Sequence, residues 1–378
     1  MKDKIITIIP SLYDGGAEKF TADLSYSLSD AYDHSLLVYN PKEKRYPHRG
    51  ELMALDIPEK RNVLARIRRQ LTVLKKIKRI KKSLQPKVVI SHMLMANMLN
   101  ILSRKNHKTI CVLHGEWSVR SGHSILLDNY IKRTYNKADV LISVSHYIKN
   151  MFDSYYQLKV PHEVVYVGVD MKQIEAKGNE ASAVDLPEKY LVYVAGFRPV
   201  KNHLKLIATL ETYLKTNDIS LVLVGDGPLR GEIERAIKKR GLEDKVRVVG
   251  NIVNPYPVIK NAKLSLVVSS SESFSLVVVE SMVLGVPVIA TDCGGPREII
   301  APNWDQEIEL PYTNDFGILI PKPAKWTHNS LANEIQNLIE NETLWRRISE
   351  NGKQRAKIFD IKNSEKQYQE IINELITS

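Results

Sequence analysis

Two glutamates that stand eight residues apart, Glu272 and Glu280, mark the most informative segment of the chain. They lie in a serine-rich stretch that follows an apolar run typical of a strand and leads into a helical pattern. The N-terminus of such a helix offers free backbone N–H groups and a positive dipole end to an anion. Glu280 could accept hydrogen bonds from paired ribose hydroxyls and Glu272 from sugar hydroxyls, although both could also be ordinary acids near the start of a helix. The residues between them that would line such a site are Ser273, Phe274, Ser275 and Leu276.

Basic side chains and histidines also follow apolar runs. Arg198 and Lys201 come just after the run at 191–194. Two cations there would suit a diphosphate, although solvated loop charges are the commoner case. His92 and His114 each directly follow an apolar run in the first half of the chain. A single histidine is more often structural than catalytic, but two in equivalent places are harder to dismiss, and His114, which precedes a glycine and an acid, is the better candidate.

Two glycine-containing turns follow strand-like runs as well. Gly15 and Gly16 separate the first apolar run from a helical pattern, which fits either a tight turn or a loop that closes over a substrate. Gly225 and Asp226 begin a Gly-Asp-Gly-Pro turn, but the next strand-like run ends before Asn251 without the acidic residue that an NAD site requires. An NAD-dependent oxidoreductase is therefore disfavoured, and these five residues are kept as candidate binding residues of another ligand.

Short β-branched apolar runs alternate with helix-length segments along the whole chain, which predicts parallel sheets built from β-α-β units. The runs form two series, so we expect two doubly wound domains, 1–170 and 171–359, with a polar linker over 170–188. A C-terminal helix over 360–378 is expected to pack back on the first domain. Ligands of such sheets bind beyond the carboxyl ends of the strands, which is where the candidate residues lie. The first series covers 5–9, 35–39, 88–91, 109–113, 140–144 and 164–167, and the second covers 191–194, 221–224, 246–249, 264–268 and 286–290.

One segment carries the net positive charge. The 378 residues include 54 Lys and Arg against 43 Asp and Glu, and eleven of the basic residues but no acidic one lie between Lys60 and Lys82. Apolar residues recur there at helical spacing, which predicts an amphipathic helix with its apolar stripe on the first sheet. Its cationic face fits an anionic lipid surface; a merely solvated face and a nucleic-acid site are the alternatives, and the latter lacks interleaved aromatic residues. The predicted stripe is Leu64, Ile67, Leu71, Leu74, Ile77, Ile80 and Leu84, and the predicted membrane-docking cations are Arg66, Arg68, Arg69, Lys75, Lys76, Lys78, Arg79 and Lys82.

Composition excludes several other classes of protein. Hydrophobic residues make up 43% and charged residues 26% of the chain, which is typical of a globular protein and not of a disordered one. The two cysteines, Cys111 and Cys293, are far apart, so a disulfide framework and a cysteine zinc site are excluded. Apolar runs fall short of a signal sequence and of the ~18 residues of a membrane span, and we expect a cytoplasmic protein.

Together these motifs resemble the retaining glycosyltransferases of family 4. The resemblance covers nearly the whole chain and implies the GT-B fold, in which two Rossmann-like α/β domains face a cleft. The first domain would lie on the acceptor side and the second would bind a nucleotide-sugar. The matching motifs are Glu272-x7-Glu280, Gly285-x-Pro287 with the Val-Ile-Ala-Thr-Asp that follows, Gly294-Gly295, Lys201-Asn202, the Gly225 turn, Gly15-Gly16-Ala17-Glu18 and Gly168-Val169-Asp170.

The resemblance also implies roles for single residues. Glu280 would hold the ribose of a nucleotide-sugar, Glu272 the transferred sugar and Lys201 the diphosphate, while His114 would lie near the reacting face of the sugar. No Asp-x-Asp motif occurs, so no metal and no cofactor are expected, and Lys201, Arg198 and the helix N-terminus near Phe274 would stabilise the leaving group.

The same resemblance suggests substrates and a location. The donor would more readily be a UDP-sugar than a GDP-sugar, and the acceptor a glycan or lipid-linked glycan of cell-surface polysaccharide synthesis. A peripheral position at the inner face of the plasma membrane follows from such an acceptor and from the basic helix, and no nucleic-acid partner is expected. A nucleotide-sugar epimerase of the same architecture is the alternative, although the two spaced glutamates favour transfer.

Two departures from the family pattern stand out. The family usually has Gly-Phe-Gly where this chain has Ser273-Phe274-Ser275, so close approach of the backbone to a donor is in question. The family's diphosphate arginine commonly stands five or six residues before the lysine, whereas Arg198 stands three residues before Lys201. Arg198 is expected to replace it.

Overall fold

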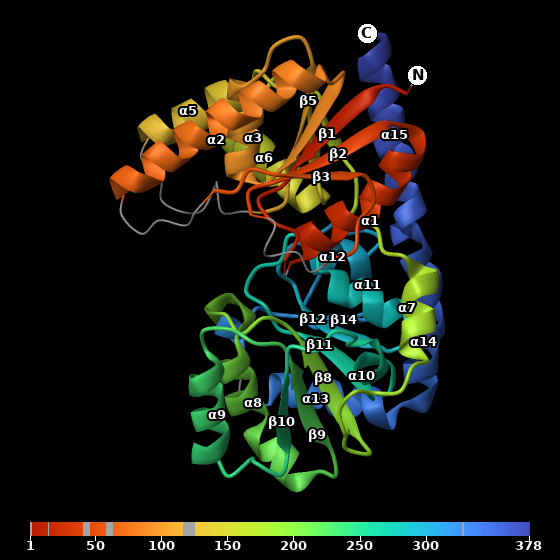
Figure 1. Cartoon of the computed structure of the whole chain (residues 1–378). Coiled ribbons are helices and arrows are strands. Elements are labelled where there is room, and N and C mark those ends of the chain that lie inside the picture. Colours follow the sequence, from red (N-terminus) through yellow and green to blue (C-terminus); the bar gives the residue numbers. More distant parts are fainter. Residues whose placement is uncertain (1, 14, 41–45, 58–62, 116–124, 327–328) are drawn as a thin grey trace. The chain divides into compact units, whose positions relative to one another are not determined.

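The computed structural model in Figure 1 describes residues 2–13, 15–40, 46–57, 63–115, 125–326 and 329–378, with backbone only for 63–67. The chain divides into two compact units, Met1–Gly168 with Ile361–Ser378 and Val169–Asp360. Each unit has its own sheet and its own hydrophobic core.

The first unit is built on a parallel sheet with the strand order β3-β2-β1-β4-β5-β6-β7. Its central strands are buried along almost their whole length, as apolar runs must be in a sheet covered on both faces. The strands are β1 (Lys4–Ile8), β2 (Asp33–Val38), β3 (Glu51–Ala54), β4 (Val88–His92), β5 (Lys108–Leu113), β6 (Val140–Ser143) and β7 (His162–Val164).

Helices from both ends of the chain cover this sheet. The last helix packs on the first one, where the rings of Phe20 and Tyr368 lie 6.0 Å apart and the Tyr32 hydroxyl donates to Asn373 Oδ1 at 2.8 Å. Elsewhere α3 packs against both α2 and α5. The helices are α1 (Gly16–Ala31), α2 (Val63–Leu84), α3 (Leu94–Leu102), α5 (Ile125–Tyr135), α6 (His146–Tyr156) and α15 (Ile361–Thr377).

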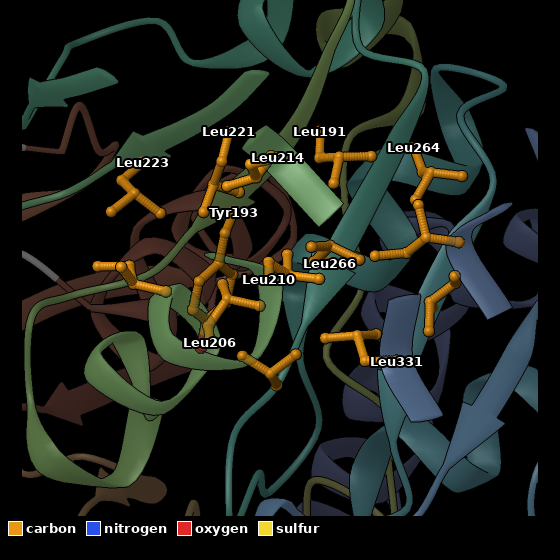
Figure 2. Close-up of a cluster of buried hydrophobic side chains, with 14 of the residues drawn as sticks. Leu191, Tyr193, Leu206, Leu210, Leu214, Leu221, Leu223, Leu264, Leu266 and Leu331 are labelled. Carbon is orange, nitrogen blue, oxygen red and sulfur yellow. The ribbon is translucent and has the colours of Figure 1, made fainter. Parts of the chain in front are cut away.

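The second unit repeats the plan with the strand order β10-β9-β8-β11-β12-β14-β13, in which β13 alone is antiparallel among the described strands. Figure 2 shows how leucines at alternate positions of the strands meet leucines four residues apart on α8 in the core of this unit. The strands are β8 (Tyr190–Val194), β9 (Ser220–Val224), β10 (Val246–Gly250), β11 (Leu264–Val267), β12 (Val288–Thr291), β13 (Tyr312–Thr313) and β14 (Ile318–Ile320). The helices are α7 (Met171–Gly178), α8 (His203–Thr216), α9 (Arg230–Lys239), α10 (Tyr256–Lys260), α11 (Leu276–Val283), α12 (Gly295–Ile300), α13 (Ser330–Glu340) and α14 (Glu342–Ala356).

These two sheets confirm the predicted α/β class, but some details differ from the predictions. The strands β3, β13 and β14 were not predicted, and the strand predicted over 164–167 is observed as β7 at His162–Val164. The linker predicted over 170–188 is wrong at its start, because Asp170 caps α7 by accepting the backbone N–H of Gln173 at 2.9 Å. That helix has the buried Ile174 on one side and belongs to the second unit.

The basic segment forms the predicted helix, α2, and most of the predicted stripe faces the first core: Ile77 is fully buried, and Leu74, Ile80 and Leu84 pack against it. Leu71 is the exception at 54% exposed, while Val73, outside the predicted stripe, is fully buried. Lys81, which is not among the predicted docking cations, lies on the same face as Ile77 and is buried. Its Nζ donates to Asn100 Oδ1 at 2.6 Å and to Ser103 Oγ at 2.7 Å, and burial lowers the pKa of Lys81 to about 7.

Candidate functional site

Lys201 and Glu272 meet where two neighbouring strands of the second unit end. Lys201 follows β8 and Glu272 follows β11, and Lys201 Nζ lies 2.5 Å from Glu272 Oε1. The hydroxyl of Ser269 donates to the same oxygen at 2.6 Å. Both donors converge on Oε1, and none of the described residues hydrogen-bonds Oε2. The carboxylate is therefore anchored through one oxygen and keeps the other for a ligand.

The backbone of Glu272 is fixed by a second loop. Its N–H donates to the carbonyl of Cys293 at 3.0 Å, and its carbonyl accepts the N–H of Gly295 at 2.9 Å. A Cβ on Gly295 would lie 2.3 Å from backbone atoms of Phe274, so only glycine permits this approach. The Gly294-Gly295 motif of the sequence thus holds the glutamate loop against the start of α12.

Two further side chains, whose part was not predicted from the sequence, fix the loop after β8, and one of them ties it to the loop after β11. Asn202, in a left-handed conformation with φ 55°, donates to the carbonyl of Val268 at 2.9 Å and to Ser270 Oγ at 2.8 Å. The buried Tyr193 hydroxyl donates to the carbonyl of Lys201 at 2.7 Å. An asparagine next to the lysine was visible in the sequence, but its partners 66 and 68 residues away were not.

Arg198 lies in the same loop but is not brought to the ion pair. Its side chain is exposed, and the described residues offer it no salt bridge. Its expected replacement of the family's arginine stays a prediction. Lys201 is thus the cation that the structure joins to Glu272.

Glu280 lies on the second turn of α11 and is buried, with 7% of its surface exposed. The hydroxyl of Tyr256 on α10 donates to its Oε1 at 3.1 Å. Phe274, before the same helix, is buried against Phe359, with 5.5 Å between ring centroids. Leu276 begins α11, while Ser273 lies in the loop before it. The two glutamates therefore flank the start of one helix, as their spacing predicts.

Ser275 carries backbone strain at this helix start. Its φ of 88° lies in the region that favours glycine, and its hydroxyl makes no capping hydrogen bond. We expect Ser275→Gly to raise the free energy of unfolding by about 0.5–1 kcal/mol, because relief of the strain exceeds the extra chain entropy of glycine. Chemical denaturation of the variant measures the gain. Ser275→Ala is the control, since it removes the hydroxyl and keeps the strain, and a variant with glycine no more stable than the one with alanine would contradict this reading.

The residues of the turn after β9 are required by its close packing and its hydrogen bonds. A Cβ on Gly225 would lie 2.1 Å from the carbonyl oxygen of Ala195, so this turn packs closely on the loop after β8. Asp226 accepts the N–H of Gly227 at 2.7 Å and pairs with Arg230 at 2.9 Å, and these contacts hold the pKa of Asp226 below its usual value. Asn251 follows β10 on the neighbouring strand. The turn brings these candidates to the same edge of the sheet as Lys201.

His203, at the first position of α8, is fully buried and neither of its ring nitrogens has a hydrogen-bond partner. It stacks on Tyr193 with 4.8 Å between centroids, and burial together with the nearby Lys201 lowers its pKa to about 4. The folded state therefore resists protonation. The contribution of His203 to the free energy of unfolding is fully present above the unfolded pKa of about 6.5. It decreases as the pH falls toward 4.

We expect His203→Phe to flatten the pH dependence of unfolding. Between about pH 6.5 and pH 5 the wild type should lose up to about 1.4 kcal/mol per pH unit more than the variant. Urea unfolding at both pH values measures the difference. Parallel pH profiles of the two proteins would show that His203 does not titrate on unfolding as proposed.

In the first unit, His114 follows β5 and bonds to the histidine that ends β4. His92 Nδ1 and His114 Nε2 lie 2.8 Å apart. Burial lowers the pKa of His114 to about 4, so the ring is neutral near pH 7. His92 is not among the predicted site residues, although its position directly after a strand, equivalent to that of His114, was a signal for it. Gly15 and Gly16 stand at the start of α1 after β1, where a Cβ on Gly15 would collide with the Glu18 carboxylate.

The cations predicted to dock on a membrane are unequally placed on α2. Lys76 reaches back to the carbonyl of Leu55, and Lys76 and Arg69 are half-buried. The side chain of Arg66 lies outside the described part. The exposed ones are Arg68, Lys75, Lys78, Arg79 and Lys82.

Neither a metal-binding cluster nor a membrane-spanning helix occurs among the described residues. Within these ranges, groups of three or more His, Cys, Asp or Glu side chains that could hold a metal ion do not occur. Among the described helices none has the length and apolar character needed to cross a bilayer.

Family models match both halves of the chain. The model described as glycosyl transferases group 1 matches residues 176–355, and the model described as glycosyltransferase family 4 matches residues 14–173.

Two characterised relatives illustrate the range of acceptors. The chain is 27% identical over 301 residues to the N-acetyl-alpha-D-glucosaminyl L-malate synthase of Bacillus anthracis, covering 76% of this chain and 73% of that protein. It is 26% identical over 368 residues to the N-acetylgalactosamine-N,N'-diacetylbacillosaminyl-diphospho-undecaprenol 4-alpha-N-acetylgalactosaminyltransferase of Campylobacter jejuni, covering 94% of this chain and 96% of that protein.

Solved structures match over the whole length. The sucrose-phosphate synthase of Thermosynechococcus elongatus has a TM-score of 0.82 at 18% identity, with 100% of both chains covered. Anabaena HepE in complex with UDP and glucose has a TM-score of 0.77 at 18% identity, with 98% of this chain and 100% of that chain covered. The chain has the GT-B fold, belongs to the family 4 glycosyltransferases and is a glycosyltransferase.

Proposed function

We propose that this glycosyltransferase moves a hexosyl or N-acetylhexosaminyl group from a UDP-sugar to a glycan or lipid-linked glycan acceptor. The observation that carries the proposal is the anchored carboxylate of Glu272, whose Oε1 holds Lys201 and Ser269 while no described residue bonds Oε2. Oε2 suits a sugar hydroxyl, and the ammonium group beside it suits the diphosphate of the same donor.

Departure of the nucleoside diphosphate develops negative charge on the phosphate oxygens. Lys201 is placed to stabilise that charge, and the free N–H groups at the start of α11 add to it. Glu280 is the proposed ribose acceptor, with its orientation fixed by the hydroxyl of Tyr256, which donates to Oε1. His114 and the Gly15-Gly16 turn, both directly after strands of the first unit, are also proposed to take part in the reaction. These cations and dipoles can stabilise the leaving group, so we propose a metal-independent reaction, with retention as in the family.

A donor panel tests this proposal directly. Incubation of the protein with UDP- and GDP-sugars, with and without EDTA, should give slow hydrolysis of one UDP-sugar that EDTA leaves unchanged. NMR of the released sugar should first show the anomer present in the donor. Loss of hydrolysis with EDTA would contradict metal independence. Turnover of GDP-sugars alone would contradict uridine as the base of the donor.

The acceptor is proposed from the relatives. The Campylobacter jejuni enzyme, which aligns over nearly the whole chain, is named for an undecaprenol-linked acceptor, whereas the Bacillus anthracis enzyme is named for malate. The full-length match and the basic helix favour a lipid-linked glycan in surface polysaccharide synthesis. The comparisons do not favour the epimerase alternative, since the characterised relatives are named for transfer to an acceptor. Transfer to a diphospho-undecaprenol glycan but not to malate is the expected result.

We also propose that α2 docks on anionic lipid, which would place the enzyme peripherally at the inner, cytoplasmic face of the plasma membrane. Lys75, Lys78 and Lys82 present exposed cations on one helix, and each cation near such a surface contributes about 1 kcal/mol. No nucleic-acid partner is proposed.

Replacement of Lys75, Lys78 and Lys82 by Gln should release the protein from anionic vesicles in a sedimentation assay. The charge-matched control replaces Arg235, Lys238 and Lys239 of α9, which are also exposed, and should sediment like the wild type. Equal loss of vesicle binding in both variants would mean that binding depends on the net charge of the protein and not on α2. Binding that changes with neither salt concentration nor the fraction of anionic lipid would contradict docking.

A further inference from the structure

His92 is a fully buried histidine with one unused ring nitrogen. Its side chain has no exposed surface, its Nδ1 lies 2.8 Å from His114 Nε2, and its Nε2 has no hydrogen-bond partner. The two rings lie 5.1 Å apart at their centroids with 34° between their planes. Desolvation by burial, together with the repulsion that a protonated His114 would exert, lowers the pKa of His92 well below its usual value, so both rings are neutral near pH 7.

The backbone around His92 is held firmly. His92 pairs with Val112 in the β4–β5 ladder, and Asn97 Nδ2 donates to the carbonyl of Val112 at 3.0 Å. Met93, directly after His92, has a φ of 75°, and its carbonyl accepts the Asn97 N–H at 2.9 Å. Strain of this kind in a non-glycine residue persists where the surroundings over-determine the conformation. The imidazole of His92 is therefore presented to His114 in one fixed orientation.

Two neutral rings that share one hydrogen bond have two possible arrangements. In the first, His92 Nδ1–H donates to His114 Nε2, and the buried His92 Nε2 is a bare acceptor. In the second, His114 Nε2–H donates to His92 Nδ1, and the proton of His92 sits on its buried Nε2 without an acceptor. A buried orphan N–H donor is rarer in proteins than an under-used acceptor, so the first arrangement is preferred.

We propose that His92 is a positioning residue that fixes the tautomer of His114, with the proton of His114 on Nδ1. None of the described residues bonds His114 Nδ1, so this N–H is the group that His114 offers to a substrate. A hydrogen-bond donor at that place would bind a hydroxyl of the transferred sugar through its oxygen, whereas the other tautomer would offer a bare acceptor. This role of the donor rests on the proposed function, while the tautomer itself does not.

The decisive experiment is ¹⁵N NMR of the imidazole nitrogens in the full chain, assigned with His92→Asn and His114→Gln. Protonated and bare ring nitrogens resonate in separate regions, and their couplings to ring protons identify the tautomer. We expect a protonated Nδ1 and a bare Nε2 on His114 in the wild type. A protonated Nε2 on His114 would overturn the proposal, whether or not the protein transfers sugar.

Two variants test the cause. In His92→Asn the amide nitrogen stands near the place of Nδ1 and can still donate to His114, whereas in His92→Gln it stands near the place of Nε2 and cannot. His92→Asn should keep the His114 tautomer and the kcat of donor turnover. His92→Gln should lose the tautomer and lower kcat more than about tenfold, because the wrong tautomer leaves His114 Nδ1 without the proton that it offers to the substrate.

The results separate the two proposals. A His114 tautomer that survives in His92→Gln overturns the role of His92, and the wild-type spectrum decides the tautomer even if a variant does not fold. A protein with the expected tautomer but without turnover of any nucleotide-sugar would instead contradict the proposed function and leave the role of His92 standing.

Discussion

Lys201→Ala is expected to lower kcat for donor turnover by about 10²-fold or more, which is about 3 kcal/mol of transition-state stabilisation. Lys201 Nζ lies 2.5 Å from Glu272 Oε1, and the lysine side chain is 24% exposed. The ion pair therefore fixes the lysine while a ligand can still reach it. As the diphosphate leaves, its charge grows and the attraction of the ammonium group grows with it. Stabilisation that exists mainly in the transition state lowers kcat more than it raises KM when it is removed.

The matched control removes a cation close by. Lys205, on the next turn of the chain in α8, is exposed and lies outside the ion pair, so Lys205→Ala should turn over the donor like the wild type. The partner gives a second check, because Glu272→Gln keeps the shape of the side chain and loses its charge. The double variant should be little slower than the slower single one, since the two groups act as a unit. Near-wild-type turnover of Lys201→Ala would remove Lys201 from the leaving-group site.

The fold could be predicted from sequence where burial leaves a continuous pattern. The inner strands of both sheets are covered on two faces and therefore appear as unbroken apolar runs, as in Leu221–Val224. The missed strands β3 and β13 lie at the edges of their sheets, and β14 has only three residues. Helix α7 was missed because its capping residue, Asp170, was assigned to a polar linker and its apolar face is short.

The α2 helix shows where periodicity stops being informative. The pattern identifies the helix and places Ile77 in the core, but it also includes Leu71, which is exposed, and leaves out Val73, which is buried. The observed face takes in Val73, Ile77 and Lys81, because the lysine finds acceptors on α3. A rule that places charge in solvent cannot anticipate a cavity of matching polar groups contributed by residues about 20 positions away.

The sequence predicts which residues belong to the candidate site, but not which of them contact one another. Motif spacing places Glu272, Glu280 and Lys201 after strands, and topology then brings strand ends together. The pairing of Lys201 with Glu272 and of His114 with His92 depends on side-chain directions at separations of 71 and 22 residues. Such contacts follow from tertiary packing alone, which is why Ser269, Asn202 and Tyr256 were also missed.

Gly295→Ala is expected to lower the free energy of unfolding of the second unit by about 2–3 kcal/mol and to slow donor turnover with it. The new Cβ would lie 2.3 Å from Phe274 backbone atoms, which cannot move aside like the end of a flexible side chain. The N–H of Gly295 also holds the carbonyl of Glu272 at 2.9 Å, so a shift of this loop displaces the carboxylate that anchors Lys201.

The measurement and control of this last prediction use the same unit. Trp304, Trp326 and Trp345 lie in it, and the chain has four tryptophans in all, so denaturation followed by tryptophan fluorescence reports mainly on its unfolding. Gly231→Ala, within α9, meets no heavy atom closer than 3.4 Å and should be neutral or stabilising by up to about 1 kcal/mol. If both alanine variants unfold like the wild type, the close approach at Gly295 does not hold the glutamate loop. If Gly295→Ala alone is destabilised yet turns over the donor normally, the loop supports the fold and Glu272 does not depend on it.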